Sequence, residues 1–127
     1  MDKLHTDGSY HYSNKDLKFE VVLPSEFIYY QTQRIEGPGY IDIEFFVPTS
    51  DRRWHIIPGY AKPIIVRVYE EKVWEEIDES EKEDFLFLDR KKGNVYTIQF
   101  WEEAPEDWTN KWTDTNREYI LNNFNLK

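Results

Sequence analysis

The stretch from Pro63 to Ile77 constrains the fold more than any other part of this sequence. At its start, Ile64, Val66 and Val68 fall on one face of an extended chain, and the opposite face is mixed. Isoleucine and valine are common in strands because a branched side chain packs well on a pleated surface. A wholly apolar face opposite a mixed face indicates a central strand that is covered on both sides.

After this strand, the spacing of the apolar residues changes to that of a helix. Val73, Trp74 and Ile77 share one helical face, and glutamates occupy the other. Glu70 and Glu71 would stand in the first turn, where negative charge complements the helix dipole. A helix this short is not stable alone in water, so we expect Trp74 to dock it on the sheet.

Further strand patterns lie on both sides of this central strand. The expected strands cover residues 10–14, 17–23, 27–36, 40–47, 85–90 and 94–101. Gly37-Pro38-Gly39 and Lys91-Lys92-Gly93 predict tight turns, so neighbouring strands should form antiparallel hairpins. In the strand at 40–47, one face holds Asp42 and Glu44, and we expect that half-polar face to be partly exposed to water.

The remaining connections contain two helix signals. Thr115-Asn116-Arg117-Glu118 has capping-box spacing and predicts a last helix that runs through Phe124. Trp108 and Trp112 are four residues apart, as on one helical turn. The acidic segment at 78–84 is interpreted as a solvated helix end and loop.

Together these elements predict an α+β fold. We expect a mostly antiparallel sheet of about six strands, with the Ile64–Tyr69 strand at or near its centre, covered by two or three helices as an α/β/α sandwich. A length of 127 residues suits one domain. We therefore assign residues 10–127 to a single domain that follows a flexible N-terminal tail, residues 1–9.

Composition excludes several classes of function. The net charge of −9 argues against nucleic acid, whose phosphates require a basic surface, and against an anionic membrane surface. The chain contains no cysteine, so disulfides and thiolate metal sites are excluded. No apolar run approaches the roughly 18 residues of a membrane span. The compartment stays open: cytoplasmic, or extracytoplasmic if the chain is an excised domain.

The first strands carry a resemblance to a known family. Residues Tyr12 to Pro24 read Y-S-N-K-D-L-K-F-E-V-V-L-P, which resembles the start of small bacterial domains of the PsbP-like fold. Val66-Arg67-Val68-Tyr69, Trp74, Val95-Tyr96-Thr97-Ile98 and Asn123-Phe124 follow in the family's order. This resemblance implies the fold and a binding or scaffolding role, and it transfers no functional residue.

Motifs of catalysis are missing from the sequence. There is no glycine-rich phosphate loop, nucleophile elbow, HExxH or EF-hand loop, so no catalytic residue and no cofactor is predicted. His5, Asp7 and His11 contain metal-binding atoms, but a polar tail is the favoured interpretation and no metal site is predicted. Whether the chain is an enzyme stays open, and the missing motifs favour a protein without catalytic activity.

The aromatic residues of the connections are the best candidates for a binding site. The expected loop at 48–63 holds Trp54, His55 and Tyr60, and Trp108 lies in a later connection. Aromatic side chains anchor protein interfaces. The main hypothesis is therefore a non-catalytic module that binds an unknown protein partner through these four residues. The competing interpretation is that their rings only close the core.

Two alternatives remain open. Trp101 and Trp112 could line a pocket for a carbohydrate or another small ligand, or for an unrecognised enzyme site. An inhibitor that masks a basic partner would suit the net charge of −9, although this rests on charge alone. The oligomeric state is not predicted.

Overall fold

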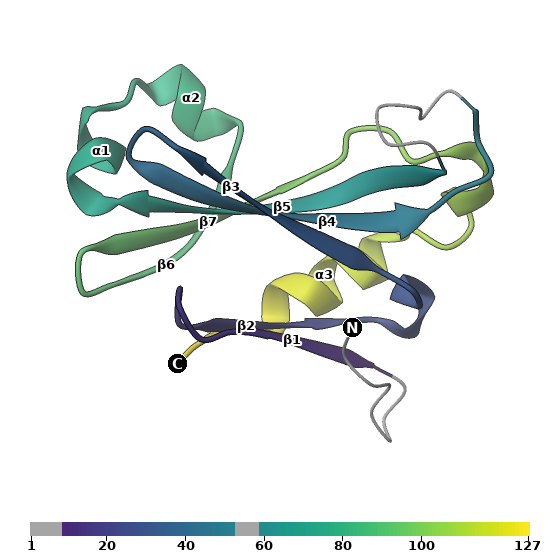
Figure 1. Ribbon diagram of the computed structural model, residues 1–127. Helices are drawn as coiled ribbons and strands as arrows, with labels where there is room; N and C mark the ends of the chain where they lie inside the picture. Colours follow the sequence, from purple (N-terminus) through teal and green to yellow (C-terminus); the bar gives the residue numbers. More distant parts are fainter. Residues whose placement is uncertain (1–8, 53–58) are drawn as a thin grey trace. The chain divides into compact units, whose positions relative to one another are not determined.

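The computed structural model describes residues 9–52 and 59–127, and it has the predicted α+β class (Figure 1). The described residues contain eight strands, three α-helices and two short 3-10 helices. The strands are β1 (Tyr10–Asn14), β2 (Phe19–Leu23), β3 (Gln31–Gly37), β4 (Tyr40–Pro48), β5 (Tyr60–Glu70), β6 (Leu86–Lys91), β7 (Asn94–Phe100) and β8 (Phe124–Leu126). The helices are α1 (Glu71–Glu76), α2 (Glu79–Glu83), α3 (Asp114–Asn122), η1 (Ser25–Phe27) and η2 (Glu106–Trp108).

The strands form two antiparallel sheets, where the sequence predicted one sheet of about six strands. One sheet has the order β1-β2-β8, and the other has the order β3-β4-β5-β7-β6. The predicted central strand is confirmed, because β5 is the middle strand of the larger sheet. The smaller sheet exists because β2 pairs with β1 along one edge and with β8 along the other.

The chain divides into two compact units. Within the described residues, unit 1 comprises 9–31, 46–52, 59–61 and 102–127, and unit 2 comprises 32–45 and 62–101. Both units draw on segments that are distant in sequence. Each unit is therefore held together by contacts between residues that are far apart in sequence.

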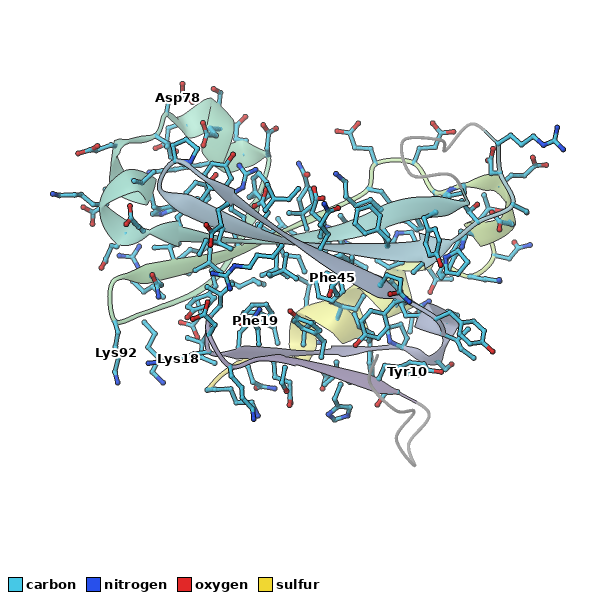
Figure 2. All side chains as sticks on the ribbon, in the orientation of Figure 1. Tyr10, Lys18, Phe19, Phe45, Asp78 and Lys92 are labelled. Atoms are coloured by element: carbon cyan, nitrogen blue, oxygen red, sulfur yellow. The ribbon has the colours of Figure 1, made fainter. Side chains whose placement is uncertain are left out.

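Unit 1 is built on β2, whose side chains Phe19, Val21 and Leu23 are fully buried. Helix α3 packs on this strand and buries Ile120. The ring of Phe19, labelled in Figure 2, stacks on Phe124 of β8 with 5.5 Å between ring centroids. An aromatic pair of this kind adds directional stabilisation to the area that it buries.

Unit 2 has its own cluster of buried side chains where α1 meets the sheet. Tyr69, Trp74 and Val95 form the cluster, and Tyr40, Val73 and Ile77 pack against it. The rings of Tyr69 and Trp74 lie 5.3 Å apart. The predictions of a helix after Glu70 and of Trp74 docking it on the sheet are therefore confirmed.

The predicted long strand at 27–36 is wrong in its first four residues. Phe27 belongs to η1 and is fully buried, with its ring 5.6 Å from that of Trp108. Tyr29 then adopts a φ of 64°, in the left-handed region, which interrupts an extended chain. Strand β3 begins only at Gln31, because the burial of Phe27 turns the chain before it.

The predicted last helix is displaced at both ends. Its N-cap is Thr113, whose hydroxyl accepts a hydrogen bond from the Asn116 N–H, so the capping box at Thr115 does not open the helix. The helix ends at Asn122, and Phe124 begins β8. The unpaired edge of β2 captures this final segment as a strand, which the helical spacing of the sequence did not indicate.

We predict that the turn between β3 and β4 tolerates no side chain larger than hydrogen at Gly39. Gly39 and Gly93 both have positive φ, 80° and 85°, but a Cβ at Gly39 would collide with Val73 while a Cβ at Gly93 would meet open space. Gly93→Ala should therefore cost only the backbone term, about 1–2 kcal/mol. Gly39→Ala should cost about 1–3 kcal/mol more through overpacking. Urea unfolding measures both, and equal losses would contradict the collision.

Candidate functional site

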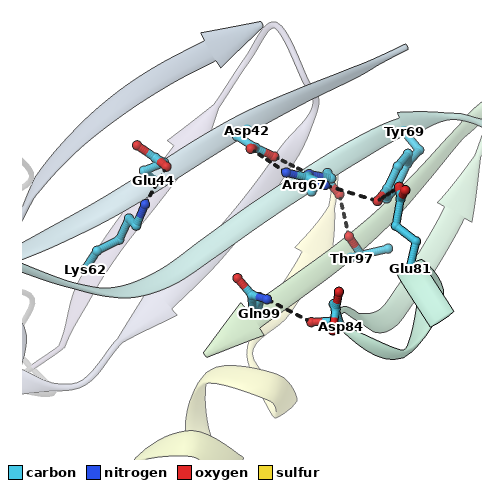
Figure 3. A network of polar contacts seen from close by, with 9 residues as sticks. All are labelled: Asp42, Glu44, Lys62, Arg67, Tyr69, Glu81, Asp84, Thr97 and Gln99. Carbon is cyan, nitrogen blue, oxygen red and sulfur yellow. Dashed lines mark hydrogen bonds and ion pairs between the residues drawn. The ribbon is translucent and has the colours of Figure 1, made fainter. Parts of the chain in front are cut away.

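A partly buried cation, Arg67, lies at the centre of the polar network of unit 2 that Figure 3 shows. Its Nε donates to Asp42 Oδ1 at 2.7 Å, and its Nη2 donates to Asp42 Oδ2 at 3.0 Å. This two-bond geometry is the strongest that a guanidinium and a carboxylate can form. Asp42 is on β4 and Arg67 is on β5, so the pair joins neighbouring strands.

The guanidinium also lies over two aromatic rings. Its Cζ is 4.0 Å from the centroid of Tyr40 and 4.4 Å from that of Phe85, which follows Asp84, the C-cap of α2. The Tyr69 hydroxyl accepts from Arg67 Nη1 at 3.3 Å and donates to Glu81 of α2 at 3.1 Å. Cation–π contacts strengthen as the cation loses water. The cluster thus fixes α2 to the sheet.

A second ion pair on this face joins Lys62 Nζ and Glu44 Oε2 at 2.8 Å. Asp42 and Glu44 are 5% and 8% exposed, so the expectation that their face is partly exposed to water is wrong. The reason is that Arg67 and Lys62 on β5 supply the opposite charges, which a strand read alone does not show. A buried carboxylate needs such a partner.

The pKa values in this cluster follow from burial and from these bonds. Burial alone would lower the pKa of Arg67, but its hydrogen bonds with Asp42 and Tyr69 raise it above the usual value. Burial raises the pKa of the Tyr69 hydroxyl. Arg67 therefore stays charged and Tyr69 stays neutral across the physiological range, which suits a fixed structural cluster better than proton transfer.

The surface beside this cluster is strongly acidic. Residues 70–84, which contain α1 and α2, hold nine acidic and two basic side chains, so this segment carries a net charge of −7. Glu75, Glu76 and most of the other carboxylates are exposed. Glu70, Glu71 and Glu75 line an open depression together with Lys72, Gly93 and Asn94. Among the residues that the structure describes, no three His, Asp or Glu side chains are placed to hold a metal ion.

An exposed aromatic ring borders these acidic residues. Phe87, on the edge strand β6, is 51% exposed, and its ring centroid lies 6.3 Å from that of Trp74 in α1. Arg90 lies over the Phe87 ring at 5.7 Å and pairs with Glu71 at 3.0 Å. We call Glu71, Glu75, Phe87 and Arg90, with the buried Trp74 ring packed against Phe87, the acidic aromatic surface.

The structure describes two of the four predicted site residues, Tyr60 and Trp108. Trp54 and His55 lie outside the described residues. Tyr60 is half-buried and is the first residue of β5, since that strand begins earlier than predicted. Trp108 is 2% exposed, and its indole N–H donates to the Pro48 carbonyl at 3.0 Å. Trp108 therefore packs inside unit 1.

The predicted loop at 48–63 is fastened at its start by η2. The Thr49 hydroxyl donates to Asp107 Oδ1 at 2.6 Å, and the Ser50 N–H donates to Asp107 Oδ2 at 3.0 Å. Asp51 Oδ2 accepts from the Glu106 N–H at 2.9 Å. Burial alone would raise the pKa of Asp107, but the hydrogen bonds from Thr49 and Ser50 lower it below its usual value.

Sequence reasoning missed both the Arg67 cluster and the acidic aromatic surface. A signal for the first was present, since Asp42 and Arg67 both interrupt apolar runs in strands that were expected to lie in one sheet. The second had a weaker signal. Phe87 stands in the apolar run from Phe85 to Leu88, which has the composition of a buried strand, and it is exposed because β6 lies at the edge of the sheet.

We predict that removing Arg67 alone is far more damaging than removing its whole ion pair. Arg67→Met leaves the buried Asp42 carboxylate without its bidentate partner, and we expect a loss of about 3 kcal/mol in the free energy of unfolding. The double variant Arg67→Met/Asp42→Leu should recover much of that loss, because an apolar pair of similar size removes the uncompensated charge. Urea unfolding of the three proteins gives the comparison. A double variant no more stable than Arg67→Met would contradict this account.

We also predict that Asp107 makes unit 1 sensitive to acid. A carboxylate whose pKa is lower in the folded state stabilises that state above its unfolded pKa, and the contribution disappears as the pH falls through the folded value. The stability difference between the wild type and Asp107→Asn should therefore shrink as the pH is lowered from neutral into the acid range. Thr49→Val, which removes one donor, should weaken the same pH dependence. Thermal unfolding across pH tests this, and a difference that stays constant would refute it.

Comparisons with known proteins gave no relative. No family model matches the sequence, and no curated protein and no solved structure is significantly similar to it. The PsbP-like resemblance therefore stays a prediction. Within the part of the chain that the structure describes, no helix is long and apolar enough to cross a membrane.

Proposed function

We propose that this protein is a non-catalytic module that binds a basic segment of a partner protein at its acidic aromatic surface. The observation that carries this proposal is Phe87, a half-exposed ring at the margin of a segment with a net charge of −7. Aromatic side chains are enriched at protein interfaces, and two charged side chains, Arg90 and its partner Glu71, lie next to this ring. The PsbP-like resemblance, with the binding role that it implies, is part of the same proposal.

The contacts of Phe87 suit it to act as an anchor. Its ring already rests on Trp74, so a partner side chain that covers it needs little rearrangement of this surface. Aromatic anchors of this kind carry a large share of the binding energy in protein interfaces.

The charge of the neighbouring helices determines which partner is favoured. Glu75 and Glu76 are exposed, and lysine or arginine side chains of a partner would pair with them. Charge complementarity of this type mainly speeds association and excludes partners of the wrong sign. We therefore expect a partner segment that combines basic residues with one aromatic or long aliphatic residue.

Selection from a library of short random peptides tests this proposal. Peptides enriched on the wild-type protein should be basic and should contain an aromatic or long aliphatic residue. Phe87→Ala should weaken their binding about tenfold, or about 1.4 kcal/mol. Glu75→Gln/Glu76→Gln should weaken it as well and reduce its salt dependence.

The matched control is Tyr29→Ala, which removes an exposed ring from unit 1; Tyr29 is 61% exposed, against 51% for Phe87. This control should bind the selected peptides as the wild type does, and circular dichroism should show that each variant is folded. Enrichment of acidic or purely polar peptides would overturn the proposal. So would selected peptides that bind equally well to Phe87→Ala.

A further inference from the structure

Among the residues that the structure describes, strand β3 has a neighbouring strand on one of its two edges and none on the other. It is the outermost strand of that sheet, with β4 as its neighbour. Every residue from Gln31 to Glu36 is exposed, although these residues alternate between the two faces of the strand. Such an edge presents backbone N–H and C=O groups that another strand can pair with.

The middle of β3 holds an apolar residue between opposite charges. Ile35 is 40% exposed and stands between Arg34 and Glu36. Arg34 Nη2 lies 3.3 Å from Glu36 Oε1, so these two side chains share one face of the strand. The order cation, isoleucine, anion is self-complementary when the strand is reversed.

The pairing register follows from this order. An antiparallel pair of two β3 strands centred on Ile35 puts Ile35 opposite the partner's Ile35. It also puts each Arg34 opposite a Glu36, where directly opposed side chains interact favourably. A register centred on Arg34 would instead bring two arginines together, which is unfavourable. Charge therefore favours one register.

The backbone is compatible with this register. A two-residue turn at Pro38-Gly39 makes Gly37 and Tyr40 the closing pair of the hairpin. Along an antiparallel strand, residues whose backbone groups face the neighbouring strand alternate with residues whose backbone groups face away from it, so Arg34 and Glu36 are expected to direct theirs to the outer edge. These are the residues that the proposed register pairs between copies.

We propose that two copies of this chain associate through β3, with Ile35 at a two-fold axis and with Arg34 and Glu36 paired in both directions. The occupant is a second copy because a two-fold interface must be self-complementary, and this edge meets that requirement in the order of its charges and in the direction of its backbone groups. The contact covers a single short strand, so the dimer is expected to be weak and dependent on protein concentration. This interface is separate from the acidic aromatic surface and does not depend on the proposed function.

Sedimentation velocity over a range of protein concentrations tests the pairing. The wild type should dimerise at high concentration. Arg34→Glu and Glu36→Arg should each be monomeric, because each puts like charges opposite one another. An equimolar mixture of the two variants should dimerise again, because every opposed pair then has opposite charges. The double variant Arg34→Glu/Glu36→Arg should also dimerise alone.

The control for a general effect of charge is Lys91→Glu, on the opposite edge strand β6, which changes the net charge by the same amount as Arg34→Glu. It should dimerise as the wild type does, and urea unfolding should show that every variant is folded. A wild type that stays monomeric at the highest concentration would overturn the proposal. A mixture of Arg34→Glu and Glu36→Arg that stays monomeric would overturn it too, as would a loss of the dimer in Lys91→Glu.

Discussion

The pairing of Arg67 with Asp42 is the interaction on which unit 2 depends. A guanidinium that lies between the rings of Tyr40 and Phe85 and binds one carboxylate twice has little freedom to move. Helix α2 is far too short to be stable alone. Arg67 holds it in place through Phe85, which follows the C-cap of this helix. Two strands, one helix and the segment after it therefore share one electrostatic centre.

Buried and exposed carboxylates have different roles in this chain. Buried carboxylates such as Asp42 and Glu44 have cations from β5 beside them, and they serve the fold. The carboxylates of α1 and α2 are mostly exposed and give this end of unit 2 its negative field. Phe87 stands at the border of that field, which is why the acidic aromatic surface, and not the Arg67 cluster, is the surface suited to a partner.

Much of the secondary structure was predictable because it depends on local patterns. The alternation around Val66 and the glutamate-rich turn after Tyr69 both describe elements that the structure confirms. The candidate site was predicted less well, because exposure depends on the neighbours that a side chain acquires. The sequence predicted Trp108 as an interface anchor, yet its indole N–H donates to the Pro48 carbonyl and its ring is buried. Phe87 belongs to an apolar run that is typical of a core, yet it lies on an edge strand.

The sequence by itself determined the α+β class, the central position of β5 and the acidic character of the segment after it, because periodicity and charge are properties of the chain alone. Only the tertiary structure decided that β1, β2 and β8 form a separate sheet, since the edge of β2 could capture Phe124 only once both were brought together. It also decided that Asp42 is buried. Burial of a charge depends on a partner from another strand, and Arg67 lies 25 residues away in sequence.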